Sequence, residues 1–529
     1  MTPEEWIAHD PDPAMAAELA GCDAGELSAR FARPLTFGTA GLRGPVRAGP
    51  DAMNLAVVMR ATWAVAMVLK DRGQAGSIVV VGRDARHGST EFATATAEVL
   101  AAEGFSVVLL PDPVPTPVLA FSVRHLPAAA GIQITASHNP PTDNGYKVYF
   151  DGGVQIVSPT DREIETAMSA APFADLIARA HVQPSGGWLV DRYSERAAQV
   201  RRSAGSVRMA LTPLHGVGGA VAVETLRRAG FDDVHTVAAQ FAPDPDFPTA
   251  GFPNPEEPGA ADALLDLAAD VDADLAIALD PDADRCAVGI PTPTGWRMLS
   301  GDETGWLLGD YLLSYVDSPT TSVVASTVVS SRLLAAIAAH YGARHVETLT
   351  GFKWLARADA NLTGATLIYA YEEAIGHCVD PDAVRDKDGI SAAVLAADLV
   401  ASLKRARRSV PDVLDDLARR HGVHVVAAVS RPVADVDEAA TLMRRLRTDP
   451  PRRLAGFAAS TTDLQPRTDA LVFTGGAGDT WVRMVVRPSG TEAKLKCYLE
   501  VRCAAAEDLD NARRRAVALR DELVDLARR

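Results

Sequence analysis

The sequence predicts an α/β protein with three related α/β domains containing mixed sheets, followed by a smaller C-terminal α+β domain. Three observations support this fold class. The chain has 529 residues, which is too long for one hydrophobic core. Short apolar runs typical of buried strands alternate with alanine-rich helical stretches. The same succession of apolar runs and polar loops also recurs three times along the chain.

The repeats open with three similar strands. Residues 77–81, 207–211 and 322–326 form the opening runs, at intervals of roughly 115–130 residues. Each repeat has a second apolar run that ends in a polar loop, and these runs are 131–134, 275–279 and 365–370. Helices are expected between the strands, for example over 220–229 and 331–340.

The pattern changes after about residue 409. A helix-rich stretch leads into a β-rich tail from about residue 423, with strands expected over 481–486 and 495–501 and an amphipathic helix near the C-terminus. We therefore predict four domains, with bounds 1–205, 206–318, 319–423 and 424–529.

The composition excludes several classes of protein. A net charge of −16 argues against binding to nucleic acid or to anionic membrane surfaces. No apolar run approaches the roughly 18 residues of a transmembrane helix, and the acidic start of the chain does not resemble a signal peptide. The five cysteines are scattered, so we expect reduced thiols and a cytoplasmic protein. We also expect a monomer or a weak homodimer.

Three aspartates mark the loop after the strand over 275–279. Asp280, Asp282 and Asp284 alternate with other residues, and this spacing can turn three carboxylates toward one centre. Such carboxylates repel one another unless a cation neutralises them, and hard oxygen ligands favour Mg²⁺. A solvated acidic turn is the alternative interpretation.

Ser137 ends the strand over 131–134 and is followed by His138, Asn139 and Pro140. Asn-Pro predicts a turn, so one hydroxyl is expected at the end of a strand, where open α/β sheets place their chemistry. An ordinary strand-to-loop serine would give the same local pattern. His138 could transfer protons, although a lone histidine is more often structural.

The segment from Arg487 to Thr491 is typical of a phosphate-binding turn. Ser489 and Thr491 supply hydroxyls, Gly490 allows close approach of the backbone, and Arg487 can bind two phosphate oxygens. Lys494 and Lys496 follow on one face of the next strand. A simple turn is the alternative.

Three other loops carry candidate residues. Glu372 and Glu373 follow a predicted buried strand and could bind vicinal sugar hydroxyls, or one could be paired and the other solvated. The glycine-rich loop 36–44 could surround an anion, or serve as a flexible connector. Lys353 and Lys387 lie in loops where surface salt bridges are the default interpretation.

Taken together and in this order, the motifs resemble those of the α-D-phosphohexomutases. The resemblance rests on Thr135–Pro140, the aspartate loop with Arg285, Glu372-Glu373 and Arg487–Thr491, and it spans about residues 35 to 501. It implies three related α/β domains and a fourth domain around a central cleft.

The resemblance also implies roles for individual residues. Ser137 is expected to carry a phosphoryl group and, with Asp280, Asp282 and Asp284, to hold one Mg²⁺ per chain. Lys387, His138 and Lys147 are the candidates for acid–base catalysis. Substrate contacts are expected from Thr39, Arg43, Arg285, Thr350, Gly351, Glu372, Ala374, Arg487, Ser489, Gly490, Thr491 and Lys496.

The implied activity is interconversion of glucose 1-phosphate and glucose 6-phosphate through a phosphoserine and a 1,6-bisphosphate, with glucose 1,6-bisphosphate as activator. Many glucose- and mannose-phosphate mutases have Glu-x-Ser in the sugar loop, whereas this chain has Glu372-Glu373-Ala374. That departure resembles the branch with larger phosphoglucomutases and phosphopentomutases, so mannose and pentose phosphates are alternatives. A Mg²⁺-dependent phosphatase and a non-catalytic sugar-phosphate sensor are the alternatives from other classes.

Overall fold

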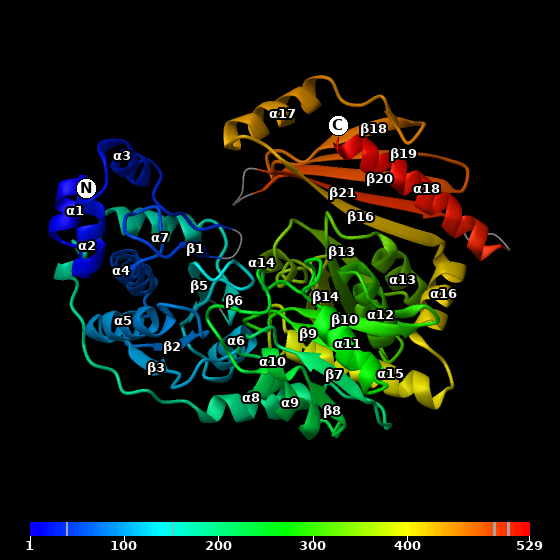
Figure 1. Cartoon of the computed structure of the whole chain (residues 1–529), viewed down its shortest axis with the longest axis horizontal. Coiled ribbons are helices and arrows are strands. Elements are labelled where there is room, and N and C mark those ends of the chain that lie inside the picture. Colours follow the sequence, from blue (N-terminus) through cyan, green and yellow to red (C-terminus); the bar gives the residue numbers. More distant parts are fainter. Residues whose placement is uncertain (39–40, 151, 490–493, 505–507, 529) are drawn as a thin grey trace. The chain divides into compact units, whose positions relative to one another are not determined.

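The computed structural model describes residues 1–529 except 39–40, 151, 490–493, 505–507 and 529. The chain divides into two compact units. Unit 1 comprises Met1–Leu299 and Gly376–Ser402, and unit 2 comprises Ser300–Ile375 and Leu403–Arg529. Unit 1 contains two of the four sheets described below, and unit 2 contains the C-terminal sheet and three strands of the remaining sheet (Figure 1).

The first sheet of unit 1 has the strand order β3-β2-β4-β5-β1, with β6 beside β5. Strand β2 pairs in parallel with β3 and β4, and β5 pairs antiparallel with β4 and β1. The elements of this region are α1 Pro3–Ala8, α2 Pro13–Ala20, α3 Ala24–Ala32, β1 Leu42–Pro45, α4 Leu55–Asp71, β2 Ile78–Arg83, α5 Ser89–Ala102, β3 Ser106–Leu109, α6 Thr116–His125, β4 Ala130–Ile134, β5 Asp143–Phe150, β6 Val154–Gln155, α7 Thr160–Ser169 and α8 Trp188–Ala198.

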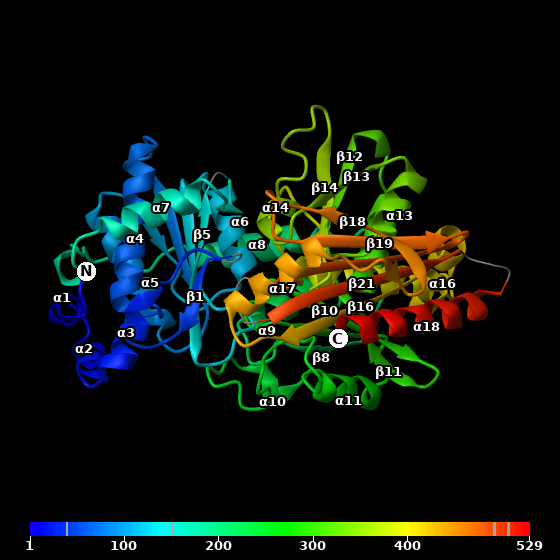
Figure 2. The ribbon, with the colours of Figure 1, turned by 90° about the horizontal axis from the view of Figure 1, so that it is seen from above.

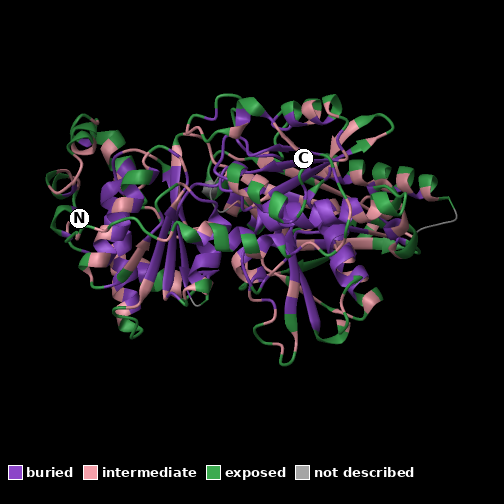
Figure 3. Cartoon of the chain, turned by 90° about the horizontal axis from the view of Figure 1, so that it is seen from below, coloured by how far each residue is buried: buried purple, intermediate pink, exposed green. Residues whose placement is uncertain are grey.

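Helices α4 and α5 pack on this sheet and enclose its main core. Val79 and Val81 of β2 face Phe92 and Leu100 of α5 within one buried cluster. Figure 3 shows buried residues along these strands and on the helices beside them. Helix α6 also packs against β2 and β4. The strand ends that carry polar loops are therefore fixed by a dense apolar layer.

The second sheet of unit 1 has the order β11-β10-β9-β7-β8 and is also mixed. Strand β7 pairs in parallel with β8 and β9, whereas β10 is antiparallel to β9 and β11. The elements of this region are β7 Met209–Thr212, α9 Gly219–Arg228, β8 Val234–Thr236, α10 Ala238–Phe241, α11 Asp262–Asp270, β9 Leu275–Leu279, β10 Cys286–Thr292 and β11 Gly295–Met298. Unit 1 also includes α15 Gly389–Arg405 and β15 Gly376–Cys378, and β15 neighbours β14 (Thr366–Glu372) in the third sheet.

Unit 2 holds a parallel β13-β12-β14 array and an antiparallel C-terminal sheet, ordered β16-β21-β20-β19-β18-β17. Figure 2 shows strands of the C-terminal sheet running side by side. The elements are α12 Gly301–Leu313, β12 Ser322–Thr327, α13 Leu333–Tyr341, β13 Arg344–Thr348, α14 Phe352–Leu355, β14 Thr366–Glu372, α16 Val410–His421, β16 Val423–Pro432, α17 Val436–Thr448, β17 Arg453–Leu454, β18 Phe457–Asp463, β19 Leu471–Ala477, β20 Thr480–Pro488, β21 Lys494–Cys503 and α18 Leu509–Arg528.

The three α/β sheets share one topology. In each, the first strand of the repeat lies between the second and the third, in the parallel triplets β3-β2-β4, β8-β7-β9 and β13-β12-β14. The third strand of each triplet, which is β4, β9 or β14, leads into the predicted serine, aspartate or glutamate loop. The repeat therefore places three different chemistries at one topological position.

The predicted fold class is confirmed, with three α/β repeats of mixed sheets and a β-rich C-terminal domain. The predicted strands occur with small shifts at their ends, and the helix expected over 331–340 is α13, Leu333–Tyr341. The four domain bounds stay a prediction. Among the described residues, no helix combines the length and apolar character needed to cross a membrane.

Candidate active site

Ser137 lies three residues beyond the end of β4 and close to the aspartate loop. Its side chain is only 2% exposed, and its hydroxyl donates a 2.9 Å hydrogen bond to Oδ2 of Asp280. His138 Nδ1 lies 3.2 Å from the same hydroxyl. The backbone of Ser137 is left-handed, with φ 55°. Two loops that are 143 residues apart in sequence thus meet at one hydroxyl.

The three aspartates converge in a tight turn after β9. Ala283 has a left-handed φ of 52°, and its N–H donates to the carbonyl of Asp280 at 2.8 Å. One oxygen from each carboxylate lies within 4.8 Å of the other two, and all three residues are fully buried. Burial and the neighbouring carboxylates hold the pKa of Asp280 well above its ordinary value.

Lys147 supplies positive charge to this cluster from strand β5. Its Nζ donates to Oδ2 of Asp282 at 2.7 Å and to Oδ2 of Asp284 at 2.8 Å. Burial alone would lower the pKa of Lys147, but the two aspartates raise it above its ordinary value. In turn, burial would raise the pKa of Asp282, but Lys147 and the hydroxyl of Thr116 lower it. Lys147 is thus held as a cation.

The aspartate cluster fits a magnesium ion. The Oδ1 atoms of Asp282 and Asp284 are buried and accept no hydrogen bond. Leaving buried carboxylate oxygens without a partner is costly, and an oxygen-liganded divalent cation would satisfy them. Together with the nearby hydroxyl of Ser137, the donor set is the one that Mg²⁺ prefers.

Close packing fixes the shape of the aspartate loop. A Cβ at Gly216 would lie 2.4 Å from the Pro281 backbone, and one at Gly389 would lie 2.4 Å from the carbonyl oxygen of Arg285. The N–H of Gly389 donates to the carbonyl of Ala283 at 3.1 Å. Glycine is therefore required where the loop after β7 and the start of α15 touch the aspartate loop.

Lys387 lies beside the same cluster. Its Nζ is 3.2 Å from Oδ2 of Asp284 and 3.6 Å from Oδ1 of Asp386. Asp386 in turn accepts hydrogen bonds from Tyr149 and Gln155. The surface salt bridge that the sequence favoured at this position is therefore wrong, because Lys387 is only 5% exposed.

Arg43 and Arg285 bring further positive charge toward Ser137. Arg43 donates to Oδ1 of Asn139 at 2.8 Å, and Arg285 Nε lies 3.9 Å from Asp280 and 3.8 Å from Asp284. Burial, followed by the charges of Arg285 and Arg43, lowers the pKa of His138 well below its ordinary value. These cations could bind the phosphoryl oxygens of an anionic substrate. The predicted residue Thr39 lies outside the described residues.

The predicted sugar-contacting residues belong to unit 2. Glu372 ends β14 and is 7% exposed. Glu373 accepts hydrogen bonds from Thr327 at 3.2 Å and from Ser330 at 3.1 Å, so it is tied to the loop after β12. Ala374 lies in the following turn.

Thr350 and Gly351 lie in the loop that leads into α14, and Gly351 has φ 107°. Thr350 is half-buried and Gly351 is buried. The positive φ of Gly351 is a backbone conformation that favours glycine, and it directly precedes helix α14.

The predicted phosphate turn connects β20 and β21 in unit 2. Arg487 lies directly opposite Lys496 in the strand pairing, and the N–H of Ser489 donates to the carbonyl of Lys494 at 2.8 Å. Like charges directly opposite each other destabilise a sheet, so an anion bound between them would be stabilising. Gly490 and Thr491 lie outside the described residues.

Sequence reasoning missed residues whose partners are distant in the chain. Thr116 at the start of α6 donates to Oδ2 of Asp282 at 2.5 Å. Arg86, between β2 and α5, contacts the carbonyl of Ser137 at 2.7 Å. For Arg86, the local signal was the polar stretch after the first opening strand, because polar loops after parallel strands meet at one edge of a sheet.

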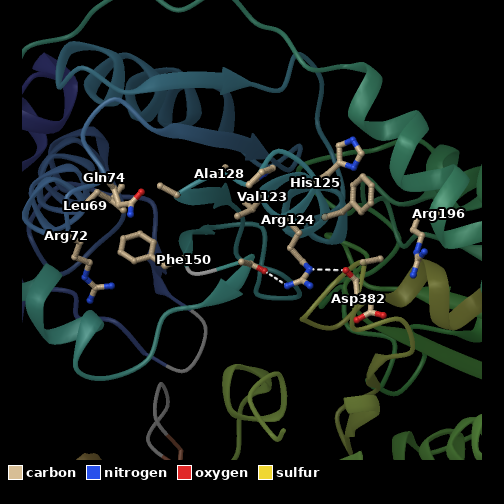
Figure 4. Close-up of a pocket in the computed structure, with 15 residues that line it drawn as sticks. Leu69, Arg72, Gln74, Val123, Arg124, His125, Ala128, Phe150, Arg196 and Asp382 are labelled. Atoms are coloured by element: carbon tan, nitrogen blue, oxygen red, sulfur yellow. Dashed lines mark hydrogen bonds between the residues drawn. The ribbon is translucent and has the colours of Figure 1, made fainter. Parts of the chain in front are cut away.

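A cavity of about 950 Å³ in unit 1 is separate from the aspartate cluster (Figure 4). Its arginines are engaged within the protein. Arg72 binds Thr160 and Glu163, Arg196 binds Asp380 through two hydrogen bonds, and Arg124 donates to the carbonyls of Gly152 and Asp382. None of the aspartates of the cluster lines this cavity.

Comparisons with known proteins place the site in a family context. Models described as the phosphoglucomutase/phosphomannomutase α/β/α domains I, II and III match residues 34–175, 190–293 and 300–421. A "Probable phosphomannomutase" of Haemophilus influenzae is 40% identical over 472 residues, with 87% of this chain and 95% of that protein covered. A phosphopentomutase of Mus musculus is 33% identical over 564 residues, covering 96% and 90%.

A solved structure shares the fold. The "Phosphoglucomutase/phosphomannomutase family protein" from Burkholderia thailandensis has a TM-score of 0.68 and 21% identity, with 91% of this chain and 97% of that chain covered.

Proposed function

The chain belongs to the phosphoglucomutase/phosphomannomutase family and is a phospho-sugar mutase, and we propose that it interconverts α-D-glucose 1-phosphate and glucose 6-phosphate. The observation that carries the proposed chemistry is the 2.9 Å hydrogen bond from Ser137 to the buried aspartate cluster. It joins a nucleophilic hydroxyl to a site suited to a divalent cation.

We propose that Ser137 is phosphorylated in the resting enzyme. A free hydroxyl of the sugar phosphate attacks this phosphorus, the bond from phosphorus to Ser137 Oγ breaks, and a sugar 1,6-bisphosphate forms. The proton of the sugar hydroxyl passes to a base, for which His138 and Lys387 are the candidates, and the departing Oγ of Ser137 takes up a proton. In the second step Ser137 attacks the other phosphate of the reoriented bisphosphate, and the leaving sugar oxygen recovers a proton.

The side chains around Ser137 have separate tasks in this scheme. Asp280, Asp282 and Asp284 would hold Mg²⁺, which when bound withdraws charge from the transferring phosphoryl group. Lys147 donates hydrogen bonds to two of these carboxylates, those of Asp282 and Asp284. Arg43 and Arg285 orient phosphoryl oxygens, which favours attack in line.

In unit 2, Arg487 and Lys496 are proposed to anchor the phosphate that does not react, and Glu372 to bind ring hydroxyls. One carboxylate binds one vicinal pair of hydroxyls, which glucose, mannose and ribose phosphates can all present. The family is named after phosphoglucomutase and phosphomannomutase. The two relatives above are named phosphomannomutase and phosphopentomutase. Glucose phosphates are therefore the first substrate to test, and the others are the alternatives.

Intact-mass spectrometry tests the proposal. After incubation with glucose 1,6-bisphosphate and Mg²⁺, the wild type should carry the mass of one phosphoryl group, and Ser137→Ala should carry none and lose mutase turnover. Ser122→Ala replaces another buried serine, whose hydroxyl bonds within α6, and should keep both properties.

Turnover of glucose, mannose and ribose 1-phosphates, followed by ³¹P NMR, then assigns the sugar. A higher kcat/KM for a pentose phosphate would replace glucose as the substrate. Release of inorganic phosphate without isomerisation would replace mutase with phosphatase. A wild type that is never phosphorylated and turns over no sugar phosphate would support a sensor instead.

A further inference from the structure

We infer that Arg86 is a positioning residue for phosphoryl transfer, because it fixes the backbone of the Ser137 loop in the conformation that presents the hydroxyl to the aspartate cluster. The inference rests on the proposed function of Ser137. It assigns to Arg86 a role in the reaction through the serine loop rather than through contact with substrate.

The guanidinium group of Arg86 donates hydrogen bonds to four backbone carbonyls of this loop. Its Nη2 donates to the carbonyl of Ser137 at 2.7 Å and to that of Asn139 at 2.6 Å. Its Nη1 donates to Pro140 at 2.7 Å and to Asp143 at 3.1 Å. The side chain is almost fully buried, with 4% of the residue exposed. Only a planar fork of donors matches this arrangement, so lysine cannot replace it.

The guanidinium group is itself held in place. Asp84 accepts from the N–H of Arg86 at 3.0 Å and lies 3.3 Å from its Nε. Ser89 donates to the same carboxylate at 2.6 Å. On another side, the guanidinium carbon lies 5.0 Å from the ring centre of Phe247. The guanidinium group is therefore fixed by Asp84, which directly follows β2 and is itself bonded to Ser89 at the start of α5, and by the ring of Phe247.

The serine loop needs an external support of this kind. Ser137 is not glycine, and its left-handed φ of 55° persists only where surrounding structure imposes it. Four carbonyl oxygens that point toward one region also repel one another and would be left without partners. Without Arg86 the loop would relax, and the 2.9 Å approach of Ser137 Oγ to Asp280 would be lost.

Arg60 provides a matched control within the same domain. It is a buried arginine that also donates to three carbonyls, those of Met168, Ala171 and Pro172. None of these carbonyls belongs to the serine loop or the aspartate loop. Arg60 and Arg86 therefore share the task of stabilising a loop, and differ in which loop they stabilise.

Arg86→Lys and Arg60→Lys should lower the midpoint of urea unfolding to a similar extent. Arg86→Lys alone should lower kcat, by about 100-fold, since small misplacements of a reacting group have effects of that size. Its KM for the sugar phosphate should change less than threefold. The ³¹P NMR signal of the phosphoserine should shift or broaden in Arg86→Lys and match the wild type in Arg60→Lys.

Equal kcat values for the two lysine variants would overturn the inference, as would a phosphoserine signal that is unchanged in Arg86→Lys. If Arg86→Lys does not fold, Ser89→Ala leaves Arg86 in place but removes a partner of Asp84, and a fall in kcat with constant KM is expected there too. A wild type without mutase activity in the same assay would instead reject the proposed function.

Discussion

Lys147 is the residue on which the charge balance of the candidate active site depends. It is 1% exposed and lies between Asp282 and Asp284, at 2.7 and 2.8 Å. A buried carboxylate cluster without a cation would be strongly destabilising. The lysine is therefore a structural requirement of the site as well as a candidate for catalysis.

Lys147→Met should lower the free energy of unfolding by about 3–5 kcal/mol in the presence of a chelator, because it removes a buried cation that is hydrogen-bonded to two buried carboxylates. Mg²⁺ should recover more stability in this variant than in the wild type, since it supplies the missing positive charge. Urea unfolding with and without Mg²⁺ measures both effects. Lys70→Met removes a partly exposed pair with Glu103 and should cost less than about 1 kcal/mol. An unchanged midpoint for Lys147→Met would contradict the expectation.

His377 should make the stability of unit 1 depend on pH. Burial lowers its pKa to about 3, whereas the unfolded chain has the ordinary value of about 6.5. The unfolded state therefore binds the proton first, and stability is lost as the pH falls below about 6.5. Between pH 7 and pH 5 this group should cost about 2 kcal/mol.

The free energy of unfolding of His377→Gln should accordingly fall less between pH 7 and pH 5 than that of the wild type, by the same amount. His181→Gln replaces an exposed histidine and should follow the wild-type curve. Parallel curves for all three proteins would reject the assignment.

At the scale of elements, the third strand of each parallel triplet determines where the chemistry lies. Ser137 follows β4, Asp280 follows β9 and Glu372 ends β14. The apolar runs predicted these strands from the sequence. The last residue of each run lies within two residues of the last residue of the observed strand. The loops could therefore be identified from local pattern alone.

The partners of the loops could not be identified in that way. Lys147 and Asp282 are 135 residues apart, and Thr116 and Asp282 are 166 apart. No periodicity connects such positions, because their contact depends on how two separate sheets pack. For the same reason, Lys387 was expected at the surface but is buried beside Asp284.

Gly216→Ala should weaken Mg²⁺ binding by about tenfold or more. The added Cβ would lie 2.4 Å from Pro281, and moving that backbone costs about 1–3 kcal/mol. Isothermal titration calorimetry with Mg²⁺ measures the change. Gly251→Ala is the control, because its added Cβ meets no atom within 4 Å. Equal affinities would show that the aspartate loop tolerates the displacement.

At the scale of the whole molecule, the two units contain different parts of the proposed machinery. Unit 1 holds Ser137 and the aspartate cluster, whereas unit 2 holds Glu372 and Arg487. The cation site and the proposed sugar and phosphate contacts should therefore be separable by mutation.

Arg487→Ala and Glu372→Gln should raise KM for the sugar phosphate by about 10- to 100-fold, as expected for losing a charged hydrogen bond. The Kd for Mg²⁺ in the same variants should equal that of the wild type. Asp282→Asn should show the opposite pattern in calorimetry, with Mg²⁺ binding lost. A variant of unit 2 that also lost Mg²⁺ affinity would contradict this separation.

The ammonium group of Lys147 has one more consequence. Because the acidic loop carries its own resident counterion, the polypeptide need not capture a metal from solution in order to reach its native shape. The ion can then bind and dissociate without unfolding the protein. Removing it with a chelator should abolish activity, and adding Mg²⁺ back should restore it.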